Sequence, residues 1–313
     1  MLCILSISVS KRQIVKITLK SAATHAGLQC AIGVLRLIAF LPYRWVAISG
    51  ATIGAALYRL PSRRKRIALI NLALCFPLKS AQDRESIARD HFRHVIRSYL
   101  ERGIQWFGSA DKINHLMVVE TSIDLDDKNP PPTIFMGFHF VGIEMGCMQY
   151  STHSPVTALY TRMSSPGISA IAKRQRSRFG ALMIERSASA RQIVRHVRAG
   201  TPVMLAADMD HGATGSVFVP FFDVPTCTLT SVSRLAVLGN ARVVPFITEV
   251  LPDYRGYKMT IYPPMKDFPS GNDSQDALAM NRFLEEQILK MPSQYYWVHR
   301  RFKNRPVGAP QVY

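Results

Sequence analysis

The sequence predicts an α/β domain with a mainly parallel sheet flanked by helices, preceded by an apolar helical segment that associates with a membrane. Two observations carry the prediction of the domain. From about residue 80 onward, short apolar runs of strand character alternate with helical segments, which is typical of parallel strands connected by helices. Hydrophobic residues make up 48% of the chain and charged residues 19%, a balance that supports a packed core and argues against disorder.

The first quarter of the chain is both basic and apolar. Residues 1–82 contain twelve Lys or Arg and no Asp or Glu, so they hold +12 of the net charge of +18. A basic arm that binds nucleic acid is normally polar, whereas a basic and apolar segment fits an anionic membrane surface. We therefore expect residues 1–66 to associate with a membrane, residues 67–313 to form the α/β domain, and no nucleic acid to bind.

Two apolar runs lie within this segment, Gly27–Leu41 and Trp45–Leu60, and they are separated by Pro42 and Arg44. Each run is shorter than the roughly 20 apolar residues that a membrane-spanning helix needs. The pattern leaves open a shallow or re-entrant helical pair, one tilted helix, or a buried helical hairpin of a soluble protein. The basic cluster Arg63–Arg66 follows at once and favours the cytoplasmic side of a membrane.

The α/β domain is predicted to begin with a long helix. Ser80 can cap its first turn, and apolar side chains recur at three- and four-residue intervals to about Phe107. Strands are expected at Thr133–Gly137, Pro155–Tyr160, Ala181–Ile184, Pro202–Ala207, Ala241–Thr248 and Tyr257–Tyr262. Further helices are expected at Gly142–Gln149, Ile168–Arg178, Ala188–Arg198, Thr230–Leu238 and Ser274–Leu289.

The stretch Gly137–Gly146 (GFHFVGIEMG) contains the residues best suited to chemistry. His139 follows a predicted buried strand at its carboxyl end, where open α/β sheets form ligand crevices. Glu144 can reach His139 only if the histidine lies on the turn before the helix and Glu144 on its first turn. A carboxylate on one imidazole nitrogen leaves the other free to remove a proton. We expect His139 to be a general base with Glu144 as partner; a core His beside an unrelated surface Glu is the alternative.

The His-x4-Glu pattern at His139 resembles the motif of the glycerolipid acyltransferases, and its Glu form resembles the lipid A late acyltransferases, the lauroyl and myristoyl transferases of Gram-negative bacteria. The resemblance covers about residues 27–306, with two departures: Met209 replaces a usual Gln, and Ser-Ser-Pro at 164–166 replaces a common Asn-Pro. The other stretches that resemble the family are Arg63–Pro77, Gly180-x3-Ile184-x-Arg186, Asp208-Met-Asp210-His-Gly212, Val217–Pro225, Val243–Phe246 and Tyr296–Pro306.

The resemblance implies an acyltransferase domain at residues 67–313. It would transfer an acyl group of the laurate or myristate class from acyl carrier protein to a hydroxyl of a 3-hydroxyacyl chain on a lipid A precursor. His139 would take the hydroxyl proton as the oxygen attacks the thioester, with no cofactor. The absence of a G-x-S-x-G motif agrees with direct transfer. The implied location is the cytoplasmic face of a Gram-negative inner membrane; a lysophospholipid or an ornithine lipid stays open as acceptor.

A second basic region extends from Lys173 to Arg198, where eight Lys or Arg accompany one acidic residue, Glu185. A phosphorylated glycolipid or the acidic acyl carrier protein would bind such a region, because Arg contacts phosphate in a bidentate manner; a solvated helix face is the alternative. Arg186 or a backbone amide would hold the charge on the thioester oxygen. The expected substrate-binding residues are Arg162, Arg174, Arg176, Gly180, Arg186, Asp208 and Asp210.

Two other classes of protein remain as alternatives. The D-x-D pattern of Asp208 and Asp210 is also how many glycosyltransferases hold a metal and a nucleotide sugar, although this reading leaves His139 and Glu144 unexplained. A membrane- or nucleic-acid-binding protein without enzymatic activity is the third hypothesis, supported only by the aromatic and basic tail. The five cysteines form no CxxC motif or Cys/His cluster, so we expect no metal site.

Overall fold

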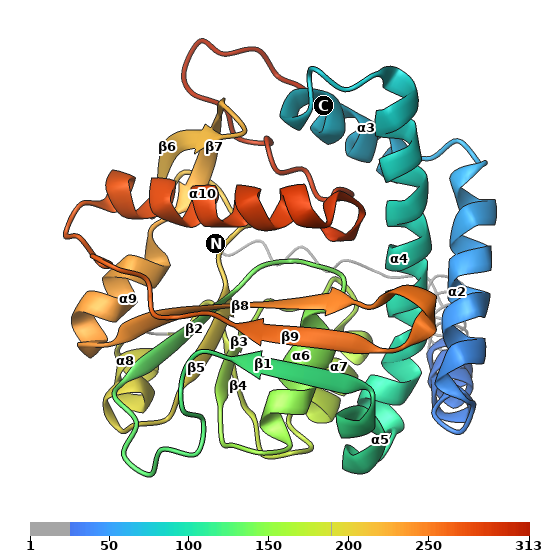
Figure 1. Ribbon diagram of the computed structural model, residues 1–313, viewed down its shortest axis with the longest axis horizontal. Coiled ribbons are helices and arrows are strands. Elements are labelled where there is room, and N and C mark those ends of the chain that lie inside the picture. The colour runs from blue at the N-terminus through green and yellow to red at the C-terminus, as the bar shows by residue number, and fades with distance from the viewer. Residues whose placement is uncertain (1–25, 189) are drawn as a thin grey trace, which may run out of the picture.

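The computed structural model describes residues 26–188 and 190–313. A helix over residues 26–38 is followed by α2 (Tyr43–Tyr58), α3 (Arg63–Cys75) and the long helix α4 (Ala81–Phe107). Helix α4 begins as predicted, with the side chain of Ser80 accepting a hydrogen bond from the amide of Asp83. Figure 1 shows α2 and α4 side by side along one edge of the molecule.

A seven-stranded sheet forms the centre of the molecule, in the order β1-β9-β8-β2-β5-β3-β4. Five strands are parallel, and β9 runs antiparallel to β8 while β1 is parallel to β9. The predicted α/β class with a mainly parallel sheet and flanking helices is confirmed. The strands are β1 (Met117–Thr121), β2 (Thr133–Gly137), β3 (Thr157–Tyr160), β4 (Leu182–Glu185), β5 (Val203–Ala206), β8 (Arg242–Val250) and β9 (Tyr257–Ile261).

Helices connect and cover these strands as the alternation of patterns predicted. Helix α6 follows β2, α7 follows β3, α8 follows β4, and α9 precedes β8. Helix α10 lies above β8 and β9 in the view of Figure 1. The helices are α5 (Ala110–His115), α6 (Ile143–Ser151), α7 (Pro166–Arg176), α8 (Ala190–Arg198), α9 (Ser231–Gly239) and α10 (Asp273–Lys290).

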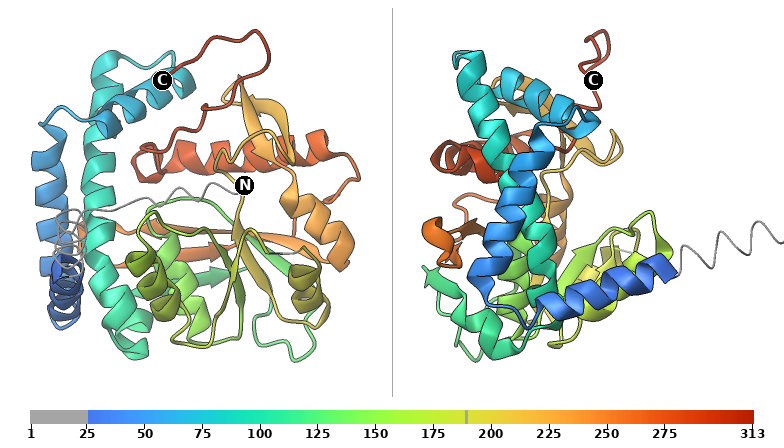
Figure 2. Two further views of the ribbon diagram at one scale, coloured as in Figure 1. Left: turned by 180° about the vertical axis from the view of Figure 1, so that it is seen from behind. Right: turned by 90° about the vertical axis from the view of Figure 1, so that its right-hand side faces the viewer.

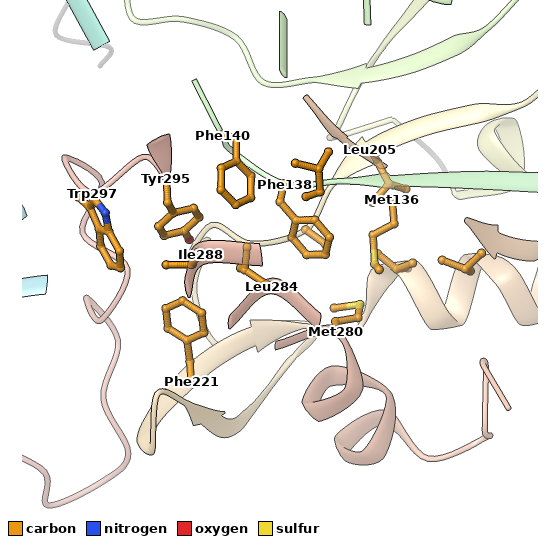
Figure 3. Packing of buried hydrophobic residues seen from close by; sticks show 14 of the residues in the cluster. Met136, Phe138, Phe140, Leu205, Phe221, Met280, Leu284, Ile288, Tyr295 and Trp297 are labelled. Carbon is orange, nitrogen blue, oxygen red and sulfur yellow. The ribbon is translucent and has the colours of Figure 1, made fainter. Parts of the chain in front are cut away.

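Strand β2 separates two hydrophobic cores. Every residue of β2 is buried, as expected for a central parallel strand with both faces covered. Ile134 and Met136 face one core, and Phe135 faces the other. Figure 3 shows Met136 and Phe138 in the first core beside Leu284 of α10. This packing fixes the end of β2, and therefore the position of the residues that follow it.

Strand β1 of the central sheet and a separate β-hairpin were not predicted. Strand β1 is a short edge strand whose residues are mostly exposed, so its sequence has no strong pattern of burial. Strands β6 (Ser216–Phe221) and β7 (Val224–Leu229) form a separate antiparallel hairpin that packs against α10. Its two-residue turn, Phe222 and Asp223, has positive φ angles of 48° and 60°, which are typical of a tight hairpin turn but uncommon for these residue types.

Helix α2 packs closely along α4. A Cβ added to Gly50 would lie 2.5 Å from the Cα of Arg97, so the two helices meet where only glycine fits. Arg97 and Glu101 of α4 form a buried ion pair with an Nε–Oε1 distance of 2.5 Å. Tyr43 of α2 and Tyr257 of β9 both hydrogen bond with this pair. These contacts tie α2 to α4 and to the sheet.

The apolar helical membrane segment predicted at the N-terminus is therefore not supported in that form. The two apolar runs form separate helices, over residues 26–38 and 43–58, and no helix within the described ranges is long and apolar enough to span a bilayer. Figure 2 shows the first of them crosswise to α2. The physical reason is that the helix is interrupted before Pro42 and that α2 packs closely on α4. Residues 1–25 lie outside the described residues, and the boundary between residues 66 and 67 stays a prediction.

Candidate active site

The register of two neighbouring parallel strands brings His139 to a carboxylate. Gly137 of β2 lies opposite Ala206 of β5, and each strand is followed, two residues later, by a polar residue: His139 and Asp208. The Nδ1 atom of His139 lies 2.7 Å from Oδ1 of Asp208. The backbone amide of His139 donates to the other oxygen, Oδ2, at 3.0 Å. Both oxygens of Asp208 therefore contact the same histidine, one at its backbone amide and one at its ring.

The predicted partnership between Glu144 and His139 is wrong in this structure. Glu144 lies on the first turn of α6, as predicted, but its Oε1 accepts from Nε of Arg176 at 2.8 Å and from Nε1 of Trp106 at 3.0 Å. Its Oε2 accepts from the same guanidinium, which makes a bidentate ion pair. The physical reason is that Glu144 faces α4 and α7, whereas the Nδ1 atom of His139 already has an acceptor in Asp208.

Charge interactions keep both carboxylates ionised. Burial alone would raise the pKa of Glu144, but the charge and hydrogen bonds of Arg176, with the charge of Arg102, lower it to about 2. Burial likewise opposes ionisation of Asp208, and the charge and hydrogen bonds of His139 outweigh it and lower the pKa of Asp208 below its ordinary value. A carboxylate can only accept hydrogen bonds, so Nδ1 of His139 carries the proton and Nε2 is the nitrogen left to accept one.

The C-terminal segment completes the surroundings of His139. The amide of Tyr296 donates to the carbonyl of His139 at 3.0 Å, and the amide of Val141 donates to the carbonyl of Gln294 at 2.9 Å. Phe140 and Tyr295 form an isolated antiparallel bridge between these two contacts. The turn after β2 is therefore held on one side by β5 and on the other by the end of the chain.

Asp210 belongs to the same loop as Asp208 but has a different role. Its Oδ2 accepts from the amide of Asn304 at 2.7 Å, and its Oδ1 accepts from the amide of Gly212 at 3.0 Å. The amide of Asp210 itself donates to Nε2 of His299 at 3.3 Å. Asp210 is buried and joins the loop after β5 to the C-terminal segment. Asp210 thus connects two segments of the chain, whereas Asp208 lies beside His139.

A cavity of about 790 Å³ opens at this edge of the sheet, and His139, Glu144, Arg176 and Arg186 line it. A volume of this order is in the range of ligand-binding sites. Most of its lining is apolar and comes from the strand ends, α6, α8 and α9. The apolar side chains include Val141, Ile143, Met148, Val156, Leu159, Met163, Met183, Ile193, Met204, Leu205, Leu229, Leu235, Leu238 and Phe246.

Polar groups in the cavity lie near His139. Arg186 follows β4, and within the described residues no hydrogen bond or ion pair engages its guanidinium. Burial, together with the charges of Arg186 and His139, lowers the pKa of His211 to about 4, so its imidazole is neutral at neutral pH. Burial, followed by the charge of Glu144, raises the pKa of the Cys147 thiol to about 12, which leaves it protonated and a poor nucleophile.

The other predicted substrate-binding residues do not line the cavity. Arg162 is 73% exposed and pairs with Glu185 at 2.7 Å. Arg174 is exposed on α7, and Gly180, with a φ of 93°, ends the turn that leads into β4. The basic region from Lys173 to Arg198 therefore divides between cavity residues such as Arg176 and Arg186 and residues on the outer surface.

Several cavity residues were missed in the sequence. Tyr99 and Arg102 come from α4, and Tyr296 comes from the C-terminal segment. The hydroxyl groups of Tyr99 and Tyr296 lie 3.1 Å apart. The long helix was predicted, but the face that it turns toward the sheet depends on how it docks. For Asp208 a signal did exist: the predicted strand Thr133–Gly137 ends two residues before His139, and the predicted strand Pro202–Ala207 ends directly before Asp208.

The fold and the cavity beside the His139–Asp208 pair are those of an α/β enzyme. Residues 18–304 match the family described as bacterial lipid A biosynthesis acyltransferase. The chain belongs to this family and is an acyltransferase of lipid A biosynthesis.

Curated relatives agree with this assignment. The lipid A biosynthesis palmitoleoyltransferase of Escherichia coli K12 is 34% identical over 285 residues, which cover 90% of this chain and 92% of the relative. The lauroyltransferase of the same organism is 33% identical and covers 90% and 93%. The myristoyltransferase is 28% identical and covers 84% and 82%. A solved 1-acyl-sn-glycerophosphate acyltransferase from Thermotoga maritima has a TM-score of only 0.32 at 12% identity, covering 73% of this chain and 93% of that chain.

Proposed function

We propose that this enzyme transfers a fatty acyl group of the laurate or myristate class from acyl carrier protein to a hydroxyl of a 3-hydroxyacyl chain on a lipid A precursor. The observation that carries the mechanism is the contact of both Asp208 oxygens with His139 at the edge of the cavity. Nδ1 is committed to this contact, so Nε2 is the general base. This assignment replaces the Glu144 partner that the motif suggested.

In the proposed reaction, Nε2 of His139 takes the proton of the acceptor hydroxyl while its oxygen attacks the carbonyl carbon of the acyl thioester. The carbon–sulfur bond then breaks, and the thiolate leaves with the proton that His139 returns. Asp208 stabilises the transient imidazolium. The guanidinium of Arg186, which has no partner among the described residues, and the neutral ring of His211 are the groups that would stabilise negative charge on the thioester oxygen.

The apolar cavity supports a hydrocarbon substrate, because burial of each methylene contributes about 0.8 kcal/mol. Relatives of similar identity are named for palmitoleoyl, lauroyl and myristoyl transfer, so sequence identity alone does not decide between these chain lengths. The exposed cations Lys173 and Arg174 of α7, near the cavity, suit the acidic surface of acyl carrier protein.

Contact with the cytoplasmic face of the inner membrane is part of the proposal. A row of large apolar side chains is exposed on the helix over residues 26–38, on the turn after it and on α2. Large apolar side chains exposed together in one part of a chain are typical of a membrane or protein contact. Its members are Val34, Leu37, Phe40, Leu41, Trp45, Ile53, Leu57 and Leu60.

The glycosyltransferase alternative loses its support at Asp208 and Asp210. A D-x-D metal site needs carboxylate oxygens that are free to bind a cation. In the structure both oxygens of Asp208 accept from His139, and both oxygens of Asp210 accept from Asn304 or Gly212. A lysophospholipid or ornithine lipid acceptor remains as an alternative substrate of the same chemistry.

The experiment is mass spectrometry of lipid A from a strain that lacks the gene, complemented with wild type, His139→Ala or His115→Ala. His115 is an exposed histidine outside the cavity and is the matched control. We expect the deletion to remove one secondary acyl chain, and wild type and His115→Ala to restore it. His139→Ala should not restore it, and the missing mass names the acyl group. Unchanged lipid A in every strain would show that the acceptor is another lipid.

A further inference from the structure

A second pocket lies between helix α3 and the end of the chain. It has a volume of about 250 Å³ and is lined by Arg63, Arg66, Ile67, Ile70, Arg300 and Tyr313. Figure 1 and both views of Figure 2 show α3 and the C-terminus together at the same end of the molecule. None of these residues lines the cavity at His139.

The pocket is held by contacts between segments that are far apart in the sequence. Nη1 of Arg64 donates to the carbonyl of Val298 at 2.8 Å. Nδ2 of Asn71 donates to the carbonyls of Trp297 and His299, each at 2.7 Å, and Oδ1 of Asn71 accepts from the hydroxyl of Tyr313. These bonds fix α3 against residues 297–299, so the position of the next residue, Arg300, is built into the fold.

The charge in this pocket is uncompensated. Among the described residues no carboxylate pairs with Arg63, Arg66 or Arg300. The first turn of α3 contains no acidic residue, although the partial positive charge at a helix N-terminus favours one there. Three guanidinium groups at one helix end therefore repel one another, and an anion in the pocket would relieve that repulsion.

Arg300 gives a second, independent sign of a missing acceptor. Its guanidinium lies 5.0 Å from the centre of the Tyr313 ring, and its Nε is shielded from solvent without a hydrogen-bond acceptor. Buried donors in proteins nearly always have a partner, so this Nε can donate to an acceptor that enters the pocket. The planar fork of arginine matches phosphate oxygens, and three arginines line this pocket of about 250 Å³.

The position of the pocket identifies the kind of molecule that brings the phosphate. Leu57 and Leu60, the last members of the exposed apolar row, immediately precede Arg63. A membrane that contacts this row would place its phosphate layer at the entrance to α3. We propose that the pocket of Arg63, Arg66 and Arg300 binds the phosphate group of an anionic membrane lipid, and so forms an anion site separate from the cavity where acyl transfer occurs.

The test measures the rate at which phenylglyoxal, an arginine-specific reagent, modifies each arginine of the purified full chain, mapped by mass spectrometry. The probes are phosphatidylglycerol vesicles, phosphatidylcholine vesicles, and a glycolipid acceptor with or without its phosphates. We expect an anionic probe to slow modification of Arg63 and Arg66 roughly tenfold, and Arg300→Gln to abolish most of this protection. Protection by vesicles alone identifies a phospholipid, and protection by the phosphorylated acceptor alone identifies the substrate.

The control is the charge-matched variant Arg282→Gln, whose exposed residue lies outside both pockets. It should keep full protection of Arg63 and Arg66. If no lipid probe slows modification of these arginines, or if Arg300→Gln leaves the protection intact, the pocket is not a phosphate site. The readout is binding rather than turnover, so a failed proposal about acyl transfer would leave this result interpretable.

Discussion

Replacing Asp208 by Asn is the substitution that most directly examines how His139 works. The two oxygens of Asp208 accept from two donors of the same residue, the backbone amide and Nδ1 of His139. An asparagine has only one such oxygen, so its amide nitrogen must face one of these donors. Two facing donors are avoided only if the imidazole moves its proton from Nδ1 to Nε2, and then Nε2 can no longer act as a base.

The size of the effect follows from the charge that is lost. When the histidine becomes an imidazolium, it lies beside a carboxylate whose charge centre is about 4 Å away. With an effective dielectric constant of about 20, this attraction is about 4 kcal/mol. At 1.36 kcal/mol for each factor of ten, Asp208→Asn should lower kcat about a thousandfold. The KM for the acceptor should change little, because Asp208 is buried behind the histidine and does not line the cavity.

The assay is the initial rate of acyl transfer by purified enzyme, normalised to the folded fraction, with Glu144→Gln as the matched control. This control removes the same charge from the other carboxylate, but it leaves both contacts of Asp208 intact. We expect Glu144→Gln to keep a kcat well above that of Asp208→Asn. If Glu144→Gln loses a thousandfold in kcat and Asp208→Asn does not, Glu144 is the partner of His139 and the reasoning above is refuted.

Three further predictions concern stability and membrane contact. The pKa of Glu144 is about 2 in the folded protein and about 4.5 ordinarily, so its ion pair with Arg176 should stabilise wild type relative to Glu144→Gln above pH 4.5. That difference should vanish as the pH falls through about 2, as followed by urea unfolding between pH 2 and 6. Gly146→Ala places a Cβ 2.0 Å from Oγ1 of Thr248, so it should lower the free energy of unfolding by about 1–3 kcal/mol. Adding Thr248→Ala should restore part of that loss; a loss unaffected by Thr248→Ala would contradict the clash. Trp45 is 66% exposed, so Trp45→Glu should weaken co-sedimentation with anionic vesicles roughly tenfold without changing thermal stability, and equal binding would exclude this side chain from the membrane contact.

Local patterns in the sequence predicted the elements around the site well. The Gly137–Gly146 stretch forms the expected strand, turn and helix, and His139 lies at the expected edge of the sheet. These features depend on hydrophobic runs and turn residues that are close together in the chain. The same is true of the long helix α4, whose capping residue Ser80 was recognised.

The partner of His139 was not predicted correctly because it depends on strand pairing. Sequence spacing draws attention to Glu144, five residues away, whereas Asp208 reaches His139 through the alignment of Gly137 with Ala206. No local pattern states which strand will lie beside β2. The contact of Trp106 with Glu144 was missed for a similar reason, since it depends on the rotation of α4 against the sheet.

The contacts of the C-terminal segment set the order in which the site can form during synthesis. The carbonyl of His139 accepts from the amide of Tyr296, and Asp210 accepts from the amide of Asn304. These donors leave the ribosome long after the strands that carry His139 and Asp210. A growing chain can pair β2 with β5, but it cannot close the turn at His139 until this segment has emerged. Ribosome-bound chains that stop before Tyr296 would therefore hold the site around His139 unfinished, which keeps any activity of that site silent until this segment has been translated.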